Sequence, residues 1–91
     1  MTAAHRATVR LREGGLSSCS VGGELVILDL DGSQYLTIRG SGIYLFELLG
    51  VERDRDELVA ALTARFEVNE GTARTDVGRF LADLAEAGLL A

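Results

Sequence analysis

The apolar residues change their spacing once along this chain, just after Ile38, and this change limits the possible folds more than any other feature. Before Ile38, apolar and polar residues alternate with a period of 2, which is the pattern of half-buried strands. After it, apolar residues recur every three or four positions, as they do on one face of a helix. The sequence therefore predicts a sheet first and a group of helices after it.

The last two strands of the predicted sheet form a β-hairpin. Glu24 to Leu30 and Gln34 to Ile38 are rich in strand-forming residues, and Asp31-Gly32 between them provides the positive φ angles that a tight turn prefers. Counting in steps of two assigns four residues to the core-facing side: Leu25, Ile27, Leu36 and Ile38. The opposite side then carries Val26, Leu28, Tyr35 and Thr37.

The pattern before the hairpin is less regular. Residues 1–6 are polar and unpatterned, so we expect them to be flexible. Residues 8–12 alternate between polar and apolar and predict a first strand. The segment 13–23 is rich in glycine and serine, which indicates loops and turns and leaves open a short strand around residues 18–21.

The first two predicted helices have recognisable ends. Ser41 is expected to cap a helix over residues 43–49, which Gly50 ends. Asp54 and Glu57 have the spacing of a capping box, in which each side chain bonds the other residue's backbone N–H. The second helix follows this box, and a predicted buried stripe runs along it: Leu58, Leu62 and Phe66.

The third predicted helix is the longest. Asn69 is expected to cap it, and Gly88 is expected to stop it after about residue 87. Its apolar face consists of Val77, Phe80, Leu81 and Leu84. The residues at 89 and 90 are expected to fold back onto the core.

The order of strands and helices predicts an α+β fold. A chain of 91 residues is long enough for one hydrophobic core and too short for two, so we expect a single domain over residues 1–91. A three-stranded antiparallel sheet followed by three helices, which cover one of its faces, is a winged-helix-turn-helix-like arrangement.

Composition argues against several classes of function. The formal net charge of −5 disfavours nucleic acid, because phosphate binding needs clustered basic residues. No run of roughly 18 apolar residues could span a membrane and no signal peptide is evident, so a cytoplasmic protein without a membrane partner is expected. A single cysteine, Cys19, and a single histidine, His5, are too few for a disulfide or a metal site and make a poor catalytic pair. We therefore expect no catalytic residues, metal or cofactor.

Two short motifs lack the residues that their usual ligands require. Asp29-Leu30-Asp31-Gly32 begins like a calcium loop, but Gln34 and Gly40 stand where that loop needs glycine and glutamate. Gly40-Ser41-Gly42 begins like a dinucleotide fingerprint, but Leu45 stands where the third glycine should be. A hairpin turn and a strand-to-helix junction explain the two motifs.

Acidic residues gather near one side of the third predicted helix: Asp76, Asp83 and Glu86. They could hold basic side chains of a partner. A solvated helix face is the favoured explanation at this stage, since exposed charges contribute little by default.

In the order and spacing of its motifs, the chain resembles the PqqD-like proteins, also called precursor peptide recognition elements. The resemblance spans residues 9–90. Its marks are Leu28-Asp29, Gly32-Ser33-Gln34-Tyr35-Leu36-Thr37-Ile38, Gly42, Asp56-Glu57-Leu58-Val59-Ala60-Ala61-Leu62, Asp76-Val77, Phe80-Leu81-Ala82-Asp83-Leu84 and Gly88-Leu89-Leu90. The chain departs from its relatives at Arg39, where many have an asparagine that caps the first helix.

This resemblance implies that the third strand is an exposed edge, to which a leader peptide adds as a further strand beside the third helix. An exposed edge presents unpaired backbone groups, so a peptide can pair with them while pockets select its side chains. The expected peptide-binding residues are Tyr35, Leu36, Thr37, Ile38, Asp76, Val77, Phe80, Leu81, Asp83 and Leu84. For the apolar members, packing in the core is the alternative role.

The partners implied by the resemblance are the leader region of a ribosomally made precursor peptide, a leader protease and a cyclase, as in lasso peptide maturation. A peptide chaperone for a radical-SAM enzyme is one alternative. A winged-helix DNA-binding regulator is another, although Arg74 and Arg79 are few beside Asp76 and Asp83.

Overall fold

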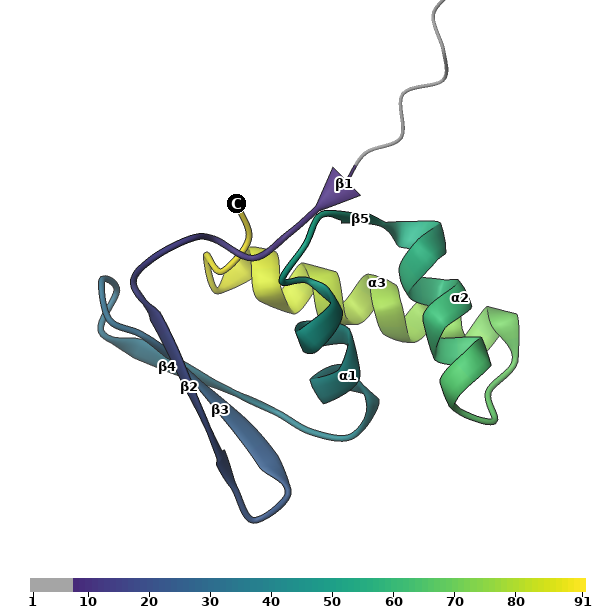
Figure 1. The fold of residues 1–91 in the computed structure, drawn as a ribbon, viewed down its shortest axis with the longest axis horizontal. Coiled ribbons are helices and arrows are strands. Elements are labelled where there is room, and N and C mark those ends of the chain that lie inside the picture. The colour runs from purple at the N-terminus through teal and green to yellow at the C-terminus, as the bar shows by residue number, and fades with distance from the viewer. Residues whose placement is uncertain (1–7) are drawn as a thin grey trace, which may run out of the picture.

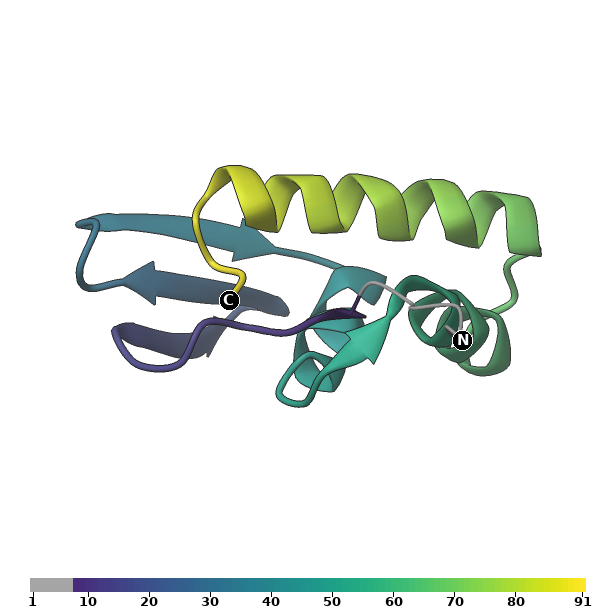
Figure 2. The same ribbon diagram turned by 90° about the horizontal axis from the view of Figure 1, so that it is seen from above.

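The computed structural model describes residues 8–91, and it has the α+β architecture expected from the sequence (Figure 1). The expectations for residues 1–6 and for His5 lie outside this range. Strands β2 (Leu16–Val21), β3 (Glu24–Asp29) and β4 (Gln34–Ile38) form an antiparallel sheet in the order β2-β3-β4. Three helices follow: α1 (Ser41–Leu48), α2 (Arg55–Arg65) and α3 (Glu70–Glu86). Figure 2 shows α3 running beside β4, with β3 and β2 farther away.

The β3–β4 hairpin has the predicted register and faces. Leu25 pairs with Ile38 and Ile27 with Leu36, so these four residues share one side of the sheet. Ile27 and Ile38 are buried on that side. Tyr35, on the opposite side, is 73% exposed, which confirms the assignment from period-2 counting.

The turn of this hairpin differs from the prediction. The positive φ angle falls on Ser33, at 54°, and not on Gly32. Asp29 pairs with Gln34, so the loop between them has four residues instead of a two-residue turn. Gly32 is needed for another reason, because a Cβ on it would lie 2.6 Å from Asp29 Oδ2.

The first strand of the sheet was predicted in the wrong place. Residues 8–12 do not join the sheet: β1 (Thr8–Val9) pairs with β5 (Arg53–Asp54), and Leu11 makes an isolated bridge with Leu90. The strand that pairs with β3 is β2, in the glycine- and serine-rich segment, where the sequence left open a short strand around residues 18–21. Five of its six residues are exposed, so it carries no buried alternation and is ordered by backbone pairing.

Two of the three predicted helix starts are confirmed. The Asp54 carboxylate accepts a hydrogen bond from the Glu57 backbone N–H at 2.8 Å, and the Glu57 carboxylate accepts one from the Asp54 N–H at 2.8 Å. Asn69 caps α3 by accepting from the Thr72 N–H at 2.8 Å. Ser41 was wrongly predicted as a cap: Gly40, with φ of 58°, precedes α1, and Ser41 is its first helical residue.

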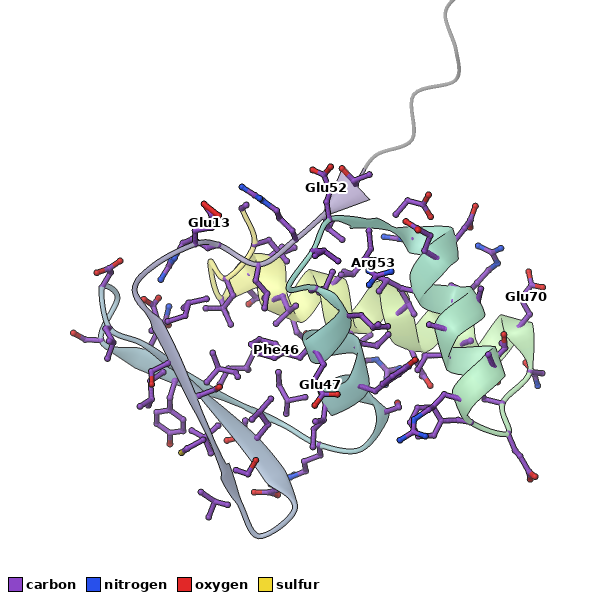
Figure 3. The ribbon with its side chains drawn as sticks, in the orientation of Figure 1. Glu13, Phe46, Glu47, Glu52, Arg53 and Glu70 are labelled. Atoms are coloured by element: carbon purple, nitrogen blue, oxygen red, sulfur yellow. The ribbon has the colours of Figure 1, made fainter. Side chains whose placement is uncertain are left out.

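The helices pack around a core that also includes the inner face of the sheet. Figure 3 shows Phe46 between α1 and the sheet. The chain after α3 turns at Gly88, with φ of 76°, and buries Leu89 as predicted. The predicted stripe on α2 is only partly buried, because Phe66 follows the last helical turn, is 38% exposed and packs edge-on against Tyr44. No helix within residues 8–91 is long and apolar enough to cross a membrane.

Candidate functional site

Strand β4 forms one edge of the three-stranded sheet. It pairs with β3 on one side, and no strand within residues 8–91 pairs with its other side. In an antiparallel pair the backbone groups of alternate residues point away from the partner strand. The free side of β4 therefore presents N–H and C=O groups to an incoming extended chain.

A groove lies along this edge, between β4, the start of α1 and the face of α3. One hollow of this groove has a volume of about 240 Å³. Strand β4 contributes Leu36, Thr37 and Ile38, and α3 contributes Asp76, Phe80, Asp83 and Leu84. These seven residues were all predicted as peptide contacts, and the fold brings them to one place.

A second hollow extends the groove toward the start of β4. It is lined by Gln34, Tyr35, Leu36, Asp83, Glu86 and Ala87. Because Leu36 and Asp83 line both hollows, the two form one groove. The groove runs from Arg39 at the end of β4 to Gln34 at its beginning, and α3 runs alongside in the opposite direction.

Two of the predicted contacts lie in the core instead. Val77 is fully buried and Leu81 is 6% exposed, and neither lines the groove. Both face inward with Ala73 and Leu84, which is the packing role that the sequence left open. Tyr35 borders the second hollow from the outer side of the sheet, where most of its side chain is exposed.

Sequence reasoning missed five residues that line the first of these two hollows: Arg39, Ser41, Gly42, Leu45 and Arg79. A usable signal existed on α3, because positions 76, 79, 80 and 83 follow one another at helical spacing beside the buried stripe. The contribution of α1 had no such signal, since it depends on where the helix begins relative to β4.

Gly42 keeps the floor of the groove open. A Cβ at this position would lie 2.9 Å from Ile38 Cγ2 and 3.5 Å from Phe80 Cδ1. The first value is shorter than any ordinary contact between carbon atoms. A larger residue would therefore displace Ile38 or project toward the space between β4 and α3.

The charges around the groove are unevenly placed. Asp83 and Glu86 are exposed beside the start of β4, whereas Arg39 and Arg79 lie toward its end. Arg39 is paired with Glu24. Within residues 8–91, Asp76, Asp83 and Glu86 have no ion-pair partner, so their carboxylates are free to bind basic groups.

The groove has the features of a binding site for an extended peptide. It combines a free backbone edge, an apolar floor and charged margins. In the part of the chain that the structure describes, no cluster of His, Cys, Asp and Glu could hold a metal ion. Cys19 is exposed on β2, outside the residues that line the groove.

The fold and the groove define a class of small α+β domains that leave a strand edge open beside an amphipathic helix. Within this class, the family model described as coenzyme PQQ synthesis protein D (PqqD) matches residues 24–90. The chain belongs to the PqqD family. No match is found among curated proteins.

Two solved structures share the fold over almost their whole length. One is described as TbiB1 in complex with the TbiA(beta) leader peptide; it is 28% identical, with a TM-score of 0.75 over 89% of this chain and 93% of that chain. The other is a lasso peptide synthetase B1 complexed with the leader peptide; it is 22% identical, with a TM-score of 0.76 over 91% of this chain and 96% of that chain. At this identity the second likeness concerns the fold alone.

Proposed function

We propose that this protein binds the leader region of a ribosomally synthesised precursor peptide, as a strand added to β4 in the groove beside α3. The observation that carries the proposal is the free edge of β4, flanked by a groove with an apolar floor. Backbone pairing supplies affinity with little demand on sequence, and the pockets on α3 select side chains. Family membership and the leader complex of TbiB1 support this function.

The expected affinity follows from the number of apolar leader side chains that the groove can bury and from the cost of ordering the leader. Two or three apolar anchors contribute about 1.5 to 3 kcal/mol each when buried, and ordering a flexible leader costs about 2 to 5 kcal/mol. Backbone hydrogen bonds from the edge must supply much of the remainder. A net of about −8 kcal/mol, which corresponds to a dissociation constant near 1 μM, is the expected range.

The bound leader would be delivered to separate enzymes in the cytoplasm, a leader protease and a cyclase of a lasso peptide pathway. The resemblance described above supports this assignment. The domain itself would contribute no catalytic group. Its role would be to raise the local concentration of the precursor at those enzymes.

The charges on α3 favour a peptide over DNA. Arg74 is held by Asp56 at 3.0 Å and by Glu70 at 3.1 Å, so its charge is already compensated. Arg79 lies one turn from both Asp76 and Asp83. A recognition helix needs several uncompensated basic residues toward phosphate and bases. Besides the paired Arg74, α3 carries Arg79 as its one other basic residue, between two acidic ones.

Fluorescence anisotropy tests the proposal directly. The probes are fluorescein-labelled leader and core segments of a candidate precursor peptide, chosen from the short reading frames beside this gene, with a labelled DNA duplex as a third ligand. We expect micromolar binding of the leader and no saturable binding of the core or the duplex. Equal binding of leader and core would rule the function out, and salt-dependent binding of the duplex would favour a DNA regulator.

A further inference from the structure

Asp29 is a charged residue in the interior of the protein. It lies at the end of β3 and is only 4% exposed. Its carboxylate accepts hydrogen bonds from Arg12 Nη2 at 2.8 Å, from the Gly32 and Asp31 backbone N–H groups at 2.9 and 3.1 Å, and from Gln34 Nε2 at 3.4 Å. A buried carboxylate with this many donors is fixed in place, because moving it would leave polar groups unpaired.

The two side chains that bind Asp29 also bind the end of α3. Gln34 Nε2 donates to the Ala87 carbonyl at 3.1 Å, and Arg12 Nη1 donates to the Gly88 carbonyl at 2.9 Å. The last carbonyls of a helix lack donors within the helix, so outside donors are well placed there. One carboxylate therefore orients two donors that join the hairpin and the N-terminal segment to the C-terminus of α3.

These links lie at one end of the groove. Gln34 and Ala87 line its second hollow, so their hydrogen bond joins β4 to α3 beside the space that a peptide would occupy. At the other end, the contact of Gly42 with Ile38 and Phe80 fixes the same two elements through apolar packing. The spacing between β4 and α3 is thus set by apolar contact at one end and by polar links at the other.

We propose that Asp29 is a positioning residue for peptide binding, which holds Gln34 and Arg12 on the end of α3 and so sets the width of the groove. The proposal rests on the proposed function, since it concerns the same groove. Asp29 is too deeply buried to contact a peptide, so its effect on binding must pass through Gln34 and Arg12.

The charge of Asp29 suits this role at neutral pH. The hydrogen bond from Arg12, followed by that from the Gly32 N–H, lowers the pKa of Asp29 from 3.8 to about 2. The group is therefore a carboxylate that can accept from several donors at once. An asparagine at the same position would direct an NH₂ group toward donors and would break part of the network.

A double-mutant cycle tests the proposal, with the labelled leader of that candidate precursor as the probe. Asp29→Asn should weaken binding about tenfold, and Gln34→Met, which keeps the side-chain size but removes the donor, should weaken it about threefold to tenfold. The double variant should bind no more weakly than Asp29→Asn alone, because both changes break the same link. Glu67→Gln is the control for the loss of one carboxylate charge. Glu67 is exposed between α2 and α3 and lines neither hollow, so this variant should bind the leader as the native chain does.

The outcomes separate this proposal from the proposed function. Suppose that the native chain binds the leader, and that the double variant loses as much affinity as the product of the losses in Asp29→Asn and Gln34→Met. The positioning role is then wrong and the function stands. The same conclusion follows if neither single variant loses affinity. If the native chain does not bind, the function and the positioning role fail together. If Asp29→Asn does not fold by circular dichroism, Gln34→Met alone decides, and unchanged affinity in that exposed variant overturns the proposal.

Discussion

Gly42 approaches Ile38 so closely that a Cβ on the glycine would stand 2.9 Å from Ile38 Cγ2. The two residues belong to the first turn of α1 and the end of β4, and their contact places the helix against the edge strand. Phe80 of α3 borders the same point, since its Cδ1 would lie 3.5 Å from that Cβ. The shape of the groove thus depends on having a glycine, with no side chain, at position 42, where β4, α1 and α3 meet.

Gly42→Ala should therefore lower stability and peptide affinity together. Overpacking costs about 1 to 3 kcal/mol, which outweighs the gain of about 0.5 to 1 kcal/mol from alanine's helix propensity. Gly78→Ala is the matched control, because its Cβ would meet nothing closer than Arg55 Nη1 at 3.8 Å. Urea denaturation should show the first variant destabilised and the second unchanged or stabilised. Equal stability of Gly42→Ala and the native chain would contradict the steric argument.

The pKa of Asp29 predicts a stability change at acid pH. Because this pKa is lowered to about 2 from 3.8, the folded state releases the proton more readily than the unfolded chain. The contribution of Asp29 to the free energy of unfolding is complete above about pH 4 and is lost as the pH falls toward about 2. Denaturation at several pH values should show the free energies of unfolding of the native chain and of Asp29→Asn approaching each other between about pH 4 and about pH 2. A difference between them that stayed constant from about pH 6 to about pH 2 would contradict the assignment.

Proline at Thr37 tests whether a peptide pairs with β4. Proline removes a backbone N–H and is poorly tolerated where a strand must pair, so Thr37→Pro should weaken leader binding by about tenfold or more. Thr37→Val keeps the N–H and should bind as the native chain does. Anisotropy titrations of both variants, with folding checked by circular dichroism, make the comparison. A folded Thr37→Pro with native affinity would exclude strand addition at this residue.

Charge reversal at Asp83 tests the acidic margin of the groove. Asp83→Lys should weaken binding of a leader that carries Lys or Arg by about threefold to tenfold at low ionic strength, and high salt should reduce the loss. Glu52→Lys makes the same change in net charge beside β1, away from the groove (Figure 3). Titrations at two salt concentrations compare the two. An equal loss in both variants would mean that total charge, and not the groove, governs binding.

Much of the fold could be predicted because its signals are local. The change of period at Ile38 separates the sheet from the helices, and register within the β3–β4 hairpin follows from alternation. The caps at Asp54 and Asn69 and the stop at Gly88 depend on residues within a turn of one another. Strand β2 could be suggested only as a short strand around residues 18–21, because it buries no alternating face and is ordered mainly by pairing with β3.

The sequence by itself determined the β3–β4 hairpin and the three helices, and its resemblance to a known family indicated the strand and the helix that border the groove. Only the tertiary structure decided that Val77 is core while Asp76, one residue earlier, lines the groove, because that choice depends on how α3 is rotated against β4. It also decided the role of Asp29, whose donors come from Arg12 and from the hairpin that follows. Periodicity reports which side of an element avoids water, but not which neighbours it meets there.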